Sequence, residues 1–241
     1  MGSMEAIISS RVMRNSHAYV VHEIGLSIIK GEFPLESILP GHLDLMEKYG
    51  VSRTVIREAM KTLSAKGLIL PRSKVGTRVQ NKSNWNLLDY DVIAWHFESG
   101  VDTEFLQHLS EIRLSFEPYA AELAAKNANA QDIAELFDLA EAMGVATDSR
   151  AKRAEVDVKF HLALITASKN PIMHSVGSMI EAALAGIFAI SSPRDDTKKV
   201  DENASAHRAI VLAIADRDGH RARTAMENVI RIGLKRVLEH K

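Results

Sequence analysis

Residues 50–63 decide the fold, and they read Gly50-Val51-Ser52-Arg53-Thr54-Val55-Ile56-Arg57-Glu58-Ala59-Met60-Lys61-Thr62-Leu63. Ser52 is typical of a helix N-cap. The polar side chains gather on the first turn and a half of the helix that follows it, and the apolar residues supply the buried side. A helix that enters the DNA major groove reads base edges from its N-terminal end. This stretch therefore has the pattern of a recognition helix.

The segments on either side predict a winged helix-turn-helix. Helical spacing of apolar residues predicts helices over residues 18–29, 43–49 and 55–66. Short β-like runs at 68–70 and 77–79 flank a basic hairpin tip between Pro71 and Gly76. The order is helix, helix, tight turn, helix and hairpin.

The rest of the chain is rich in alanine and has helical periodicity throughout. Helices are expected over residues 89–98, 102–126, 130–145, 150–168, 171–190, 200–216 and 219–240. The fold class is therefore mostly α, with an all-α antiparallel bundle after the winged helix. The expected domains are a DNA-binding domain over 11–80, a linker and linking helix over 81–100, and an all-α effector-binding and dimerisation domain over 101–241.

Composition is that of an ordinary soluble protein. The 241 residues are 46% apolar and 25% charged, and none is cysteine, which excludes disulfides and thiolate metal sites. No apolar run approaches the ~20 residues that span a bilayer, and no signal peptide is visible, so we expect no membrane contact and a cytoplasmic protein. Residues 1–4 resemble a cloning remnant. Residues 1–80 carry 11 Lys and Arg against 7 Asp and Glu, a basic balance compatible with nucleic acid.

Arg53 and Arg57 stand on the first turns of the expected recognition helix. The planar fork of arginine suits guanine O6 and N7, and the hydroxyls of Ser52 and Thr54 suit phosphate or base edges. The alternative is that the two arginines only solvate an exposed helix face.

Residues 31–79 resemble the GntR superfamily of winged-helix regulators. The resemblance rests on the Gly-Val-Ser-Arg-Thr-x-x-Arg-Glu-Ala core, Gly67-Leu68-Ile69 and Gly76-Thr77-Arg78-Val79. The all-α remainder resembles the FCD ligand-binding domain of the FadR branch. The linker Trp85-Asn86-Leu87-Leu88-Asp89-Tyr90-Asp91-Val92 is similar to that of galactonate-operon-type repressors and other sugar-acid regulators.

This resemblance implies a repressor that binds a palindromic operator as a homodimer. It assigns base and phosphate contacts to Arg53, Thr54 and Arg57, the helix cap to Ser52 and the wing tip to Gly76, with Lys74 beside it to hold phosphate. The chain departs from the family at Leu43, where an arginine is common, so one expected DNA contact is missing.

Asp157 and His161 are four residues apart and face one side of a helix, and His207 lies on a later helix. These donors suit Zn first, with Ni or Mn as alternatives; a plain hydrogen bond between the helical pair is the other interpretation. The resemblance implies an FCD metal site at these three residues. The third histidine of that site aligns with Val229, which cannot bind metal, so water, the effector or Asn203 is left to complete it.

Arg113 matches the family arginine that points into the effector chamber, where a guanidinium can hold a carboxylate bidentately. This implies a small carboxylic or sugar acid as effector. The alternative role is an ion pair with Glu117, four residues further on.

Two other functions stay open at this point. One is a metal-dependent hydrolase that activates water with Asp157, His161 and His207, although the sequence nominates no general base for it. The other is a regulator whose metal is purely structural or absent, and which responds to something other than an acid.

Overall fold

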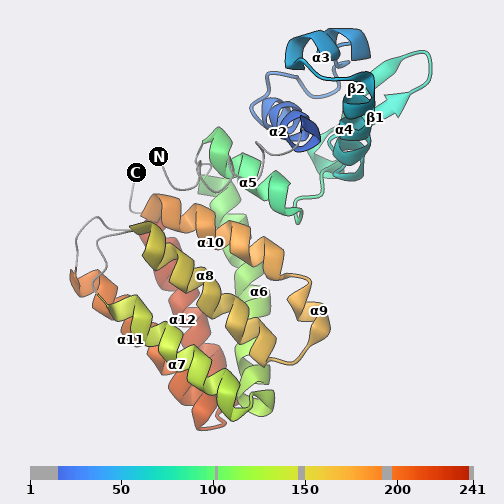
Figure 1. Ribbon diagram of the computed structural model, residues 1–241. Coiled ribbons are helices and arrows are strands. Elements are labelled where there is room, and N and C mark those ends of the chain that lie inside the picture. Colours follow the sequence, from blue (N-terminus) through green and yellow to red (C-terminus); the bar gives the residue numbers. More distant parts are fainter. Residues whose placement is uncertain (1–15, 101–102, 146–149, 192–196, 239–241) are drawn as a thin grey trace. The chain divides into compact units, whose positions relative to one another are not determined.

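The computed structural model describes residues 16–100, 103–145, 150–191 and 197–238, and the chain divides into two compact units with the boundary between residues 101 and 102. The expected mostly α fold with a two-stranded wing is confirmed (Figure 1). The first unit contains α2 (Ser16–Ile29), α3 (His42–Tyr49), α4 (Arg53–Ala65), β1 (Ile69–Arg72), β2 (Gly76–Val79), the 3-10 helix η1 (Lys82–Asn84) and α5 (Tyr90–Ser99).

The helix-turn-helix forms where the sequence pattern predicts it. α3 ends at Gly50, whose φ of 64° turns the chain, and the N–H of Gly50 donates to the carbonyl of Met46. α4 then begins at Arg53, because the hydroxyl of Ser52 accepts a hydrogen bond from the N–H of Val55 at 3.4 Å. The predicted start at residue 55 was two residues late. The core of this unit is apolar and includes Val20, Ile24, Ile28, Leu45, Ile56, Leu63, Leu68 and Val79.

The wing is an antiparallel hairpin with a shorter turn than expected. β1 and β2 pair from Ile69 opposite Val79 to Arg72 opposite Gly76, so the turn holds only residues 73–75. Gly76 has a φ of 107°, and a Cβ there would lie 2.9 Å from Cγ2 of Ile38. The hairpin itself therefore requires glycine at this position.

The linking helix α5 packs against α2 of the same unit through Trp95, which is buried. Its indole N–H donates to Nδ1 of His22 at 3.0 Å. The ring lies where a side chain at Gly25 would be: a Cβ on Gly25 would meet it at 2.4 Å. At the start of α5, Lys66 Nζ contacts Asp89 at 2.6 Å and Asp91 at 2.8 Å. Aromatic packing and ion pairs together fix α5 to this unit.

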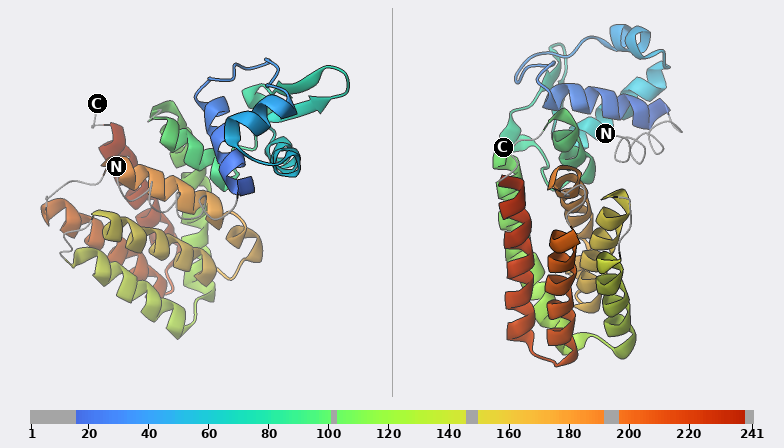
Figure 2. Two further views of the ribbon diagram at one scale, coloured as in Figure 1. Left: turned by 45° about the horizontal axis from the view of Figure 1, so that its top comes forward. Right: turned by 90° about the vertical axis from the view of Figure 1, so that its left-hand side faces the viewer.

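The second unit is a bundle of α6 (Thr103–Asn127), α7 (Ala130–Gly144), α8 (Arg150–Ala167), α9 (Pro171–His174), α10 (Gly177–Ser191), α11 (Thr197–Ala215) and α12 (Gly219–Leu238). α6 packs against α8, α10, α11 and α12, and Figure 2 shows the long helices side by side. The single helix expected over 171–190 is wrong. Asn170 caps a short α9, which ends at Ser175 before α10 begins.

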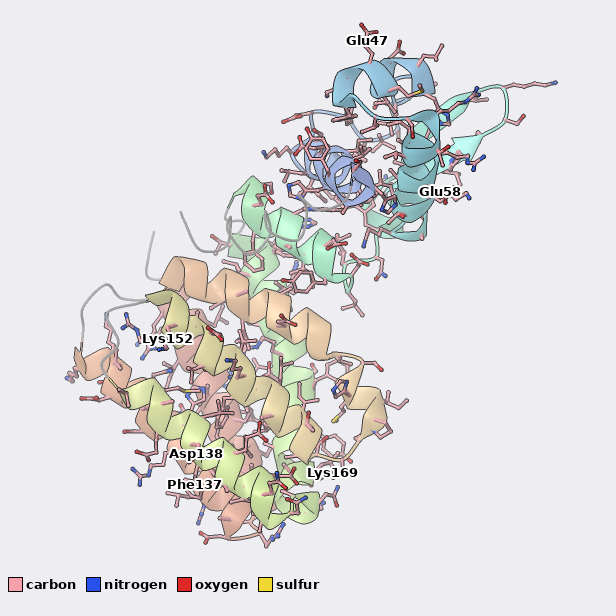
Figure 3. The ribbon with its side chains drawn as sticks, viewed as in Figure 1. Glu47, Glu58, Phe137, Asp138, Lys152 and Lys169 are labelled. Atoms are coloured by element: carbon pink, nitrogen blue, oxygen red, sulfur yellow. The ribbon has the colours of Figure 1, made fainter. Side chains whose placement is uncertain are left out.

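Polar contacts tie one end of this bundle together. Nη1 of Arg217 donates to the carbonyl oxygens of Ala125 at 3.2 Å and Ala128 at 2.8 Å. These carbonyl groups lie at the C-terminal end of α6, where helix carbonyls have no N–H partner within the helix. Lys169, which Figure 3 labels, places its Nζ atom 2.7 Å from the carboxylate of Asp132, near the start of α7. Among the helices within the described ranges, none is long and apolar enough to cross a membrane.

We predict that Gly25→Ala destabilises the first unit, although alanine normally stabilises a helix relative to glycine by about 0.5–1 kcal/mol. The new methyl group has no room beside Trp95, and overpacking of this kind costs about 1–3 kcal/mol. Tryptophan fluorescence during thermal unfolding reports on this unit alone, because Trp85 and Trp95 are the only tryptophans of the chain.

The matched control is Gly233→Ala in α12, where a Cβ would meet no atom within 4 Å. Circular dichroism should show that this variant keeps or gains stability. A Gly25→Ala protein with an unchanged or raised fluorescence midpoint would contradict the packing of α5 on α2.

Candidate DNA interface and candidate metal centre

The N-terminal face of α4 is open to solvent. Ser52, Arg53, Thr54 and Arg57 are all exposed. The side chain of Arg57 is 63% exposed and lies 3.4 Å from Glu58, which Lys61 also contacts at 3.0 Å (Figure 3 labels Glu58). Lys61 stands four residues after Arg57 and continues the basic stripe along the helix. Lys61 was not among the DNA contacts expected from the sequence.

The wing and α3 add further exposed residues of this unit. Lys74 and Gly76 are exposed at the hairpin tip, and Lys74 has a φ of 62°. Leu43, at the position where the family often has arginine, is 75% exposed on α3.

The second unit encloses a polar cluster. Asp157 and His161 lie on α8 and His207 on α11, and the three side chains are only 3%, 1% and 1% exposed. Oδ1 of Asp157 is 2.9 Å from Nε2 of His207 and 3.7 Å from Nε2 of His161, and the two Nε2 atoms are 3.5 Å apart. The helix spacing of Asp157 and His161 was visible in the sequence, whereas His207 joins them only through the packing of α11.

Hydrogen bonds on the far side of each imidazole fix its tautomer. Nδ1 of His161 is 2.5 Å from Oε2 of Glu117, and Nδ1 of His207 is 2.8 Å from the backbone carbonyl of Asn203. Both partners accept hydrogen bonds, so Nδ1 of each ring donates and Nε2 of each ring faces Asp157. Oδ1 of Asp157, close as it is to His207, makes no hydrogen bond. Oδ1 of Asp157 and the two Nε2 atoms therefore point at one another.

This arrangement fits a metal ion. The three donor atoms lie within 4.8 Å of one another. Zinc bonds of about 2.0–2.1 Å at tetrahedral angles place neighbouring ligand atoms about 3.4 Å apart, close to the separations found here. Each histidine also has the outer hydrogen bond that metal-ligating histidines use to hold their orientation.

Glu117 and Arg113 extend the cluster onto α6, and both are buried. Nε of Arg113 donates to Oε1 of Glu117 at 2.5 Å, and Nη2 lies 3.4 Å from Oε2. Burial alone would raise the pKa of Glu117, but Arg113 and His161 outweigh it and lower the pKa to about 2. The same opposition, with His207 as the strongest partner, lowers the pKa of Asp157 below its ordinary value. Both side chains are therefore carboxylates.

Two residues of this region went unrecognised in the sequence. Glu117 was considered only as an ion-pair partner of Arg113, because its 44-residue separation from His161 hides the second contact. Phe160 packs edge-on against both imidazoles, with ring centroids 5.8 Å from His161 and 4.9 Å from His207. The side chain of Asn203 contacts Sδ of Met143 at 3.9 Å, and its backbone orients His207.

The two units match two family models. The one described as bacterial regulatory proteins, gntR family, covers residues 17–79, and the FCD domain covers residues 108–231. The chain belongs to the GntR family. It is 37% identical to the uncharacterized HTH-type transcriptional regulator YieP of Escherichia coli, over 89% of the chain and 92% of that protein. It is 29% identical to the galactonate operon transcriptional repressor of E. coli, over 91% and 96% respectively.

Solved structures agree with this assignment. The GntR protein of Streptococcus agalactiae superposes with a TM-score of 0.50 at 25% identity, over 91% of this chain and 99% of that one. E. coli McbR/YncC shares the fold with a TM-score of 0.56 at 18% identity, over 93% and 98%.

These GntR relatives are transcription regulators, and this chain is a DNA-binding transcription regulator of the same family. The comparisons do not support the alternative of a metal-dependent hydrolase. The polar cluster of the FCD domain therefore belongs to a regulator that is not an enzyme.

Proposed function

We propose that this GntR regulator represses an operon for the use of a sugar acid or a related small carboxylic acid, and that the acid releases it from DNA. The release depends on a divalent metal, zinc in the first place, held by Asp157, His161 and His207. The observation that carries this proposal is the convergence of the Asp157 carboxylate and the Nε2 atoms of two histidines at the spacing of a tetrahedral zinc site.

The charges of the cluster favour an acidic effector. Histidines that bind a metal are neutral. Arg113 alone then opposes the carboxylates of Glu117 and Asp157, and the buried side chains carry one net negative charge. A divalent cation reverses this to one net positive charge, and a carboxylate then balances it. When bound, the metal supplies a Lewis-acidic position for an oxygen of the acid. Val229 is an aliphatic residue where the family has a third histidine, so the protein leaves that position free.

The DNA-facing residues of the proposal are Ser52, Arg53, Thr54, Arg57, Lys74 and Gly76. Two copies of the chain read the half-sites of a palindromic operator, because a twofold protein matches a twofold duplex. Sedimentation equilibrium at micromolar concentration checks the dimer. Bacterial operators lie in the cytoplasm, so the proposed role requires the protein there.

We predict that Arg57→Ala weakens specific operator binding by about 1–3 kcal/mol, which is the discrimination of one good arginine contact to a base. A duplex selected by the wild-type protein from a random pool serves as the operator, and binding is measured at fixed salt. Arg208→Ala, at an exposed arginine of α11, is the control and should bind normally. Equal affinity of the Arg57→Ala protein would remove Arg57 from the interface.

We predict that the protein purified without chelator contains about one zinc ion per chain, as measured by elemental analysis. His161→Ala and Asp157→Asn should lose the metal, because each removes one of three ligands. His220→Ala, at an exposed histidine of α12, should keep it. A wild-type protein that stays free of metal after dialysis against zinc would contradict the site.

We predict that Arg113→Lys raises the effector concentration needed for DNA release at least tenfold and leaves DNA binding without effector unchanged. Lysine keeps the positive charge beside Glu117 but lacks the planar fork that holds a carboxylate. Thermal shift with a panel of sugar acids, galactonate first, identifies the acid. The matched control is Arg208→Lys. If the Arg113→Lys protein releases DNA at the same effector concentration as the wild-type protein, Arg113 does not bind the effector.

A further inference from the structure

A single carboxylate joins the arginine of the cluster to one of its histidines. Glu117 is 1% exposed and lies on α6 between Arg113 and His161. Oε1 accepts from Nε of Arg113, and Oε2 accepts from Nδ1 of His161, each at 2.5 Å. Hydrogen bonds of this length to an ionised acceptor are among the stronger ones in proteins.

Only a carboxylate can satisfy both neighbours. Arg113 and the Nδ1–H of His161 are both donors, and an ionised glutamate is an acceptor on both oxygens. An amide has one accepting oxygen and one donating NH₂ group, so it would leave one of the two donors unpaired. Glutamine at this position therefore fits either neighbour but not both.

The two contacts act on different parts of the proposed site. Oε2 of Glu117 fixes the ring of His161 with Nε2 toward Asp157 and makes this nitrogen a better ligand, as outer carboxylates do for metal-bound histidines. Oε1 holds the guanidinium of Arg113, whose other N–H groups stay available to an incoming acid.

We propose that Glu117 is a positioning residue that couples the metal and the effector: it shares one carboxylate between the histidine that holds the metal and the arginine that holds the acid. An acid that binds Arg113 draws the guanidinium from Glu117, and the carboxylate then turns more fully to His161. Because such coupling is reciprocal, the metal raises the affinity for the acid by the same factor. This inference rests on the proposed function.

The test is the affinity for zinc and for cobalt(II), measured by competition with a chromogenic chelator and by the visible spectrum of bound cobalt. Glu117→Gln should weaken zinc binding 10–100-fold and shift the cobalt bands. Glu111→Gln, at an exposed glutamate of the same helix, is the control and should leave both unchanged.

Glu117→Gln leaves Arg113 buried without a counter-ion, which can prevent folding. A double variant, Arg113→Met with Glu117→Gln, removes both members of the ion pair, so no buried charge is left unpaired there. Its zinc affinity is compared with that of the single variant Arg113→Met. In folded protein, the double variant should still bind zinc 10–100-fold more weakly than wild type, whereas Arg113→Met alone should not weaken zinc binding.

Wild-type zinc affinity and an unchanged cobalt spectrum in the double variant would show that Glu117 only neutralises Arg113, and would overturn this inference while the metal site stands. A wild-type protein that binds neither zinc nor cobalt would overturn the metal site and the inference together.

Discussion

The second unit is organised around the burial of ionised groups in a helical bundle. A buried carboxylate is costly unless it is paired with a charge or hydrogen-bond donors. Here Glu117 pairs with Arg113 and His161, and Asp157 lies against His207. These groups come from α6, α8 and α11, so the pairing specifies how the three helices stand together. Phe160 closes the cluster with an apolar ring against both imidazoles. The atom left without a hydrogen bond, Oδ1 of Asp157, lies where a cation would satisfy it.

The first unit is stabilised by different means. Its core is apolar, and Arg53, Arg57 and Lys61 are exposed on α4. Buried apolar area gives the unit its stability, and the exposed basic residues of α4 lie outside this core. The linking helix belongs energetically to this unit, through Trp95 and Lys66.

Much of this organisation could be predicted from the sequence, because the signals are local. The cap at Ser52, the glycine stop at residue 50 and the four-residue spacing of Asp157 and His161 are all properties of neighbouring residues. The break between α9 and α10 was missed, because the apolar pattern runs on while Asn170 and Pro171 start a separate short helix. The link from Glu117 to His161 joins residues far apart in sequence, and only the packing of α6 on α8 creates it. Gly76 shows another limit: the resemblance assigned it to the wing tip as a DNA-facing residue, whereas its φ angle and the neighbouring Ile38 already require glycine there.

Asp89 has two roles, and a single carboxylate oxygen serves both. Its Oδ1 atom accepts from the N–H groups of Asp91 and Val92 at the start of α5, and it also receives the ammonium group of Lys66. Asparagine at position 89 would keep the helix cap but lose the counter-ion of Lys66, and alanine would lose both. Loss of the positive charge at position 66 would leave Asp89 and Asp91 unopposed. Among related regulators, we therefore expect positions 66, 89 and 91 to covary. The contacts that attach α5 to the end of α4 would then be kept or lost together.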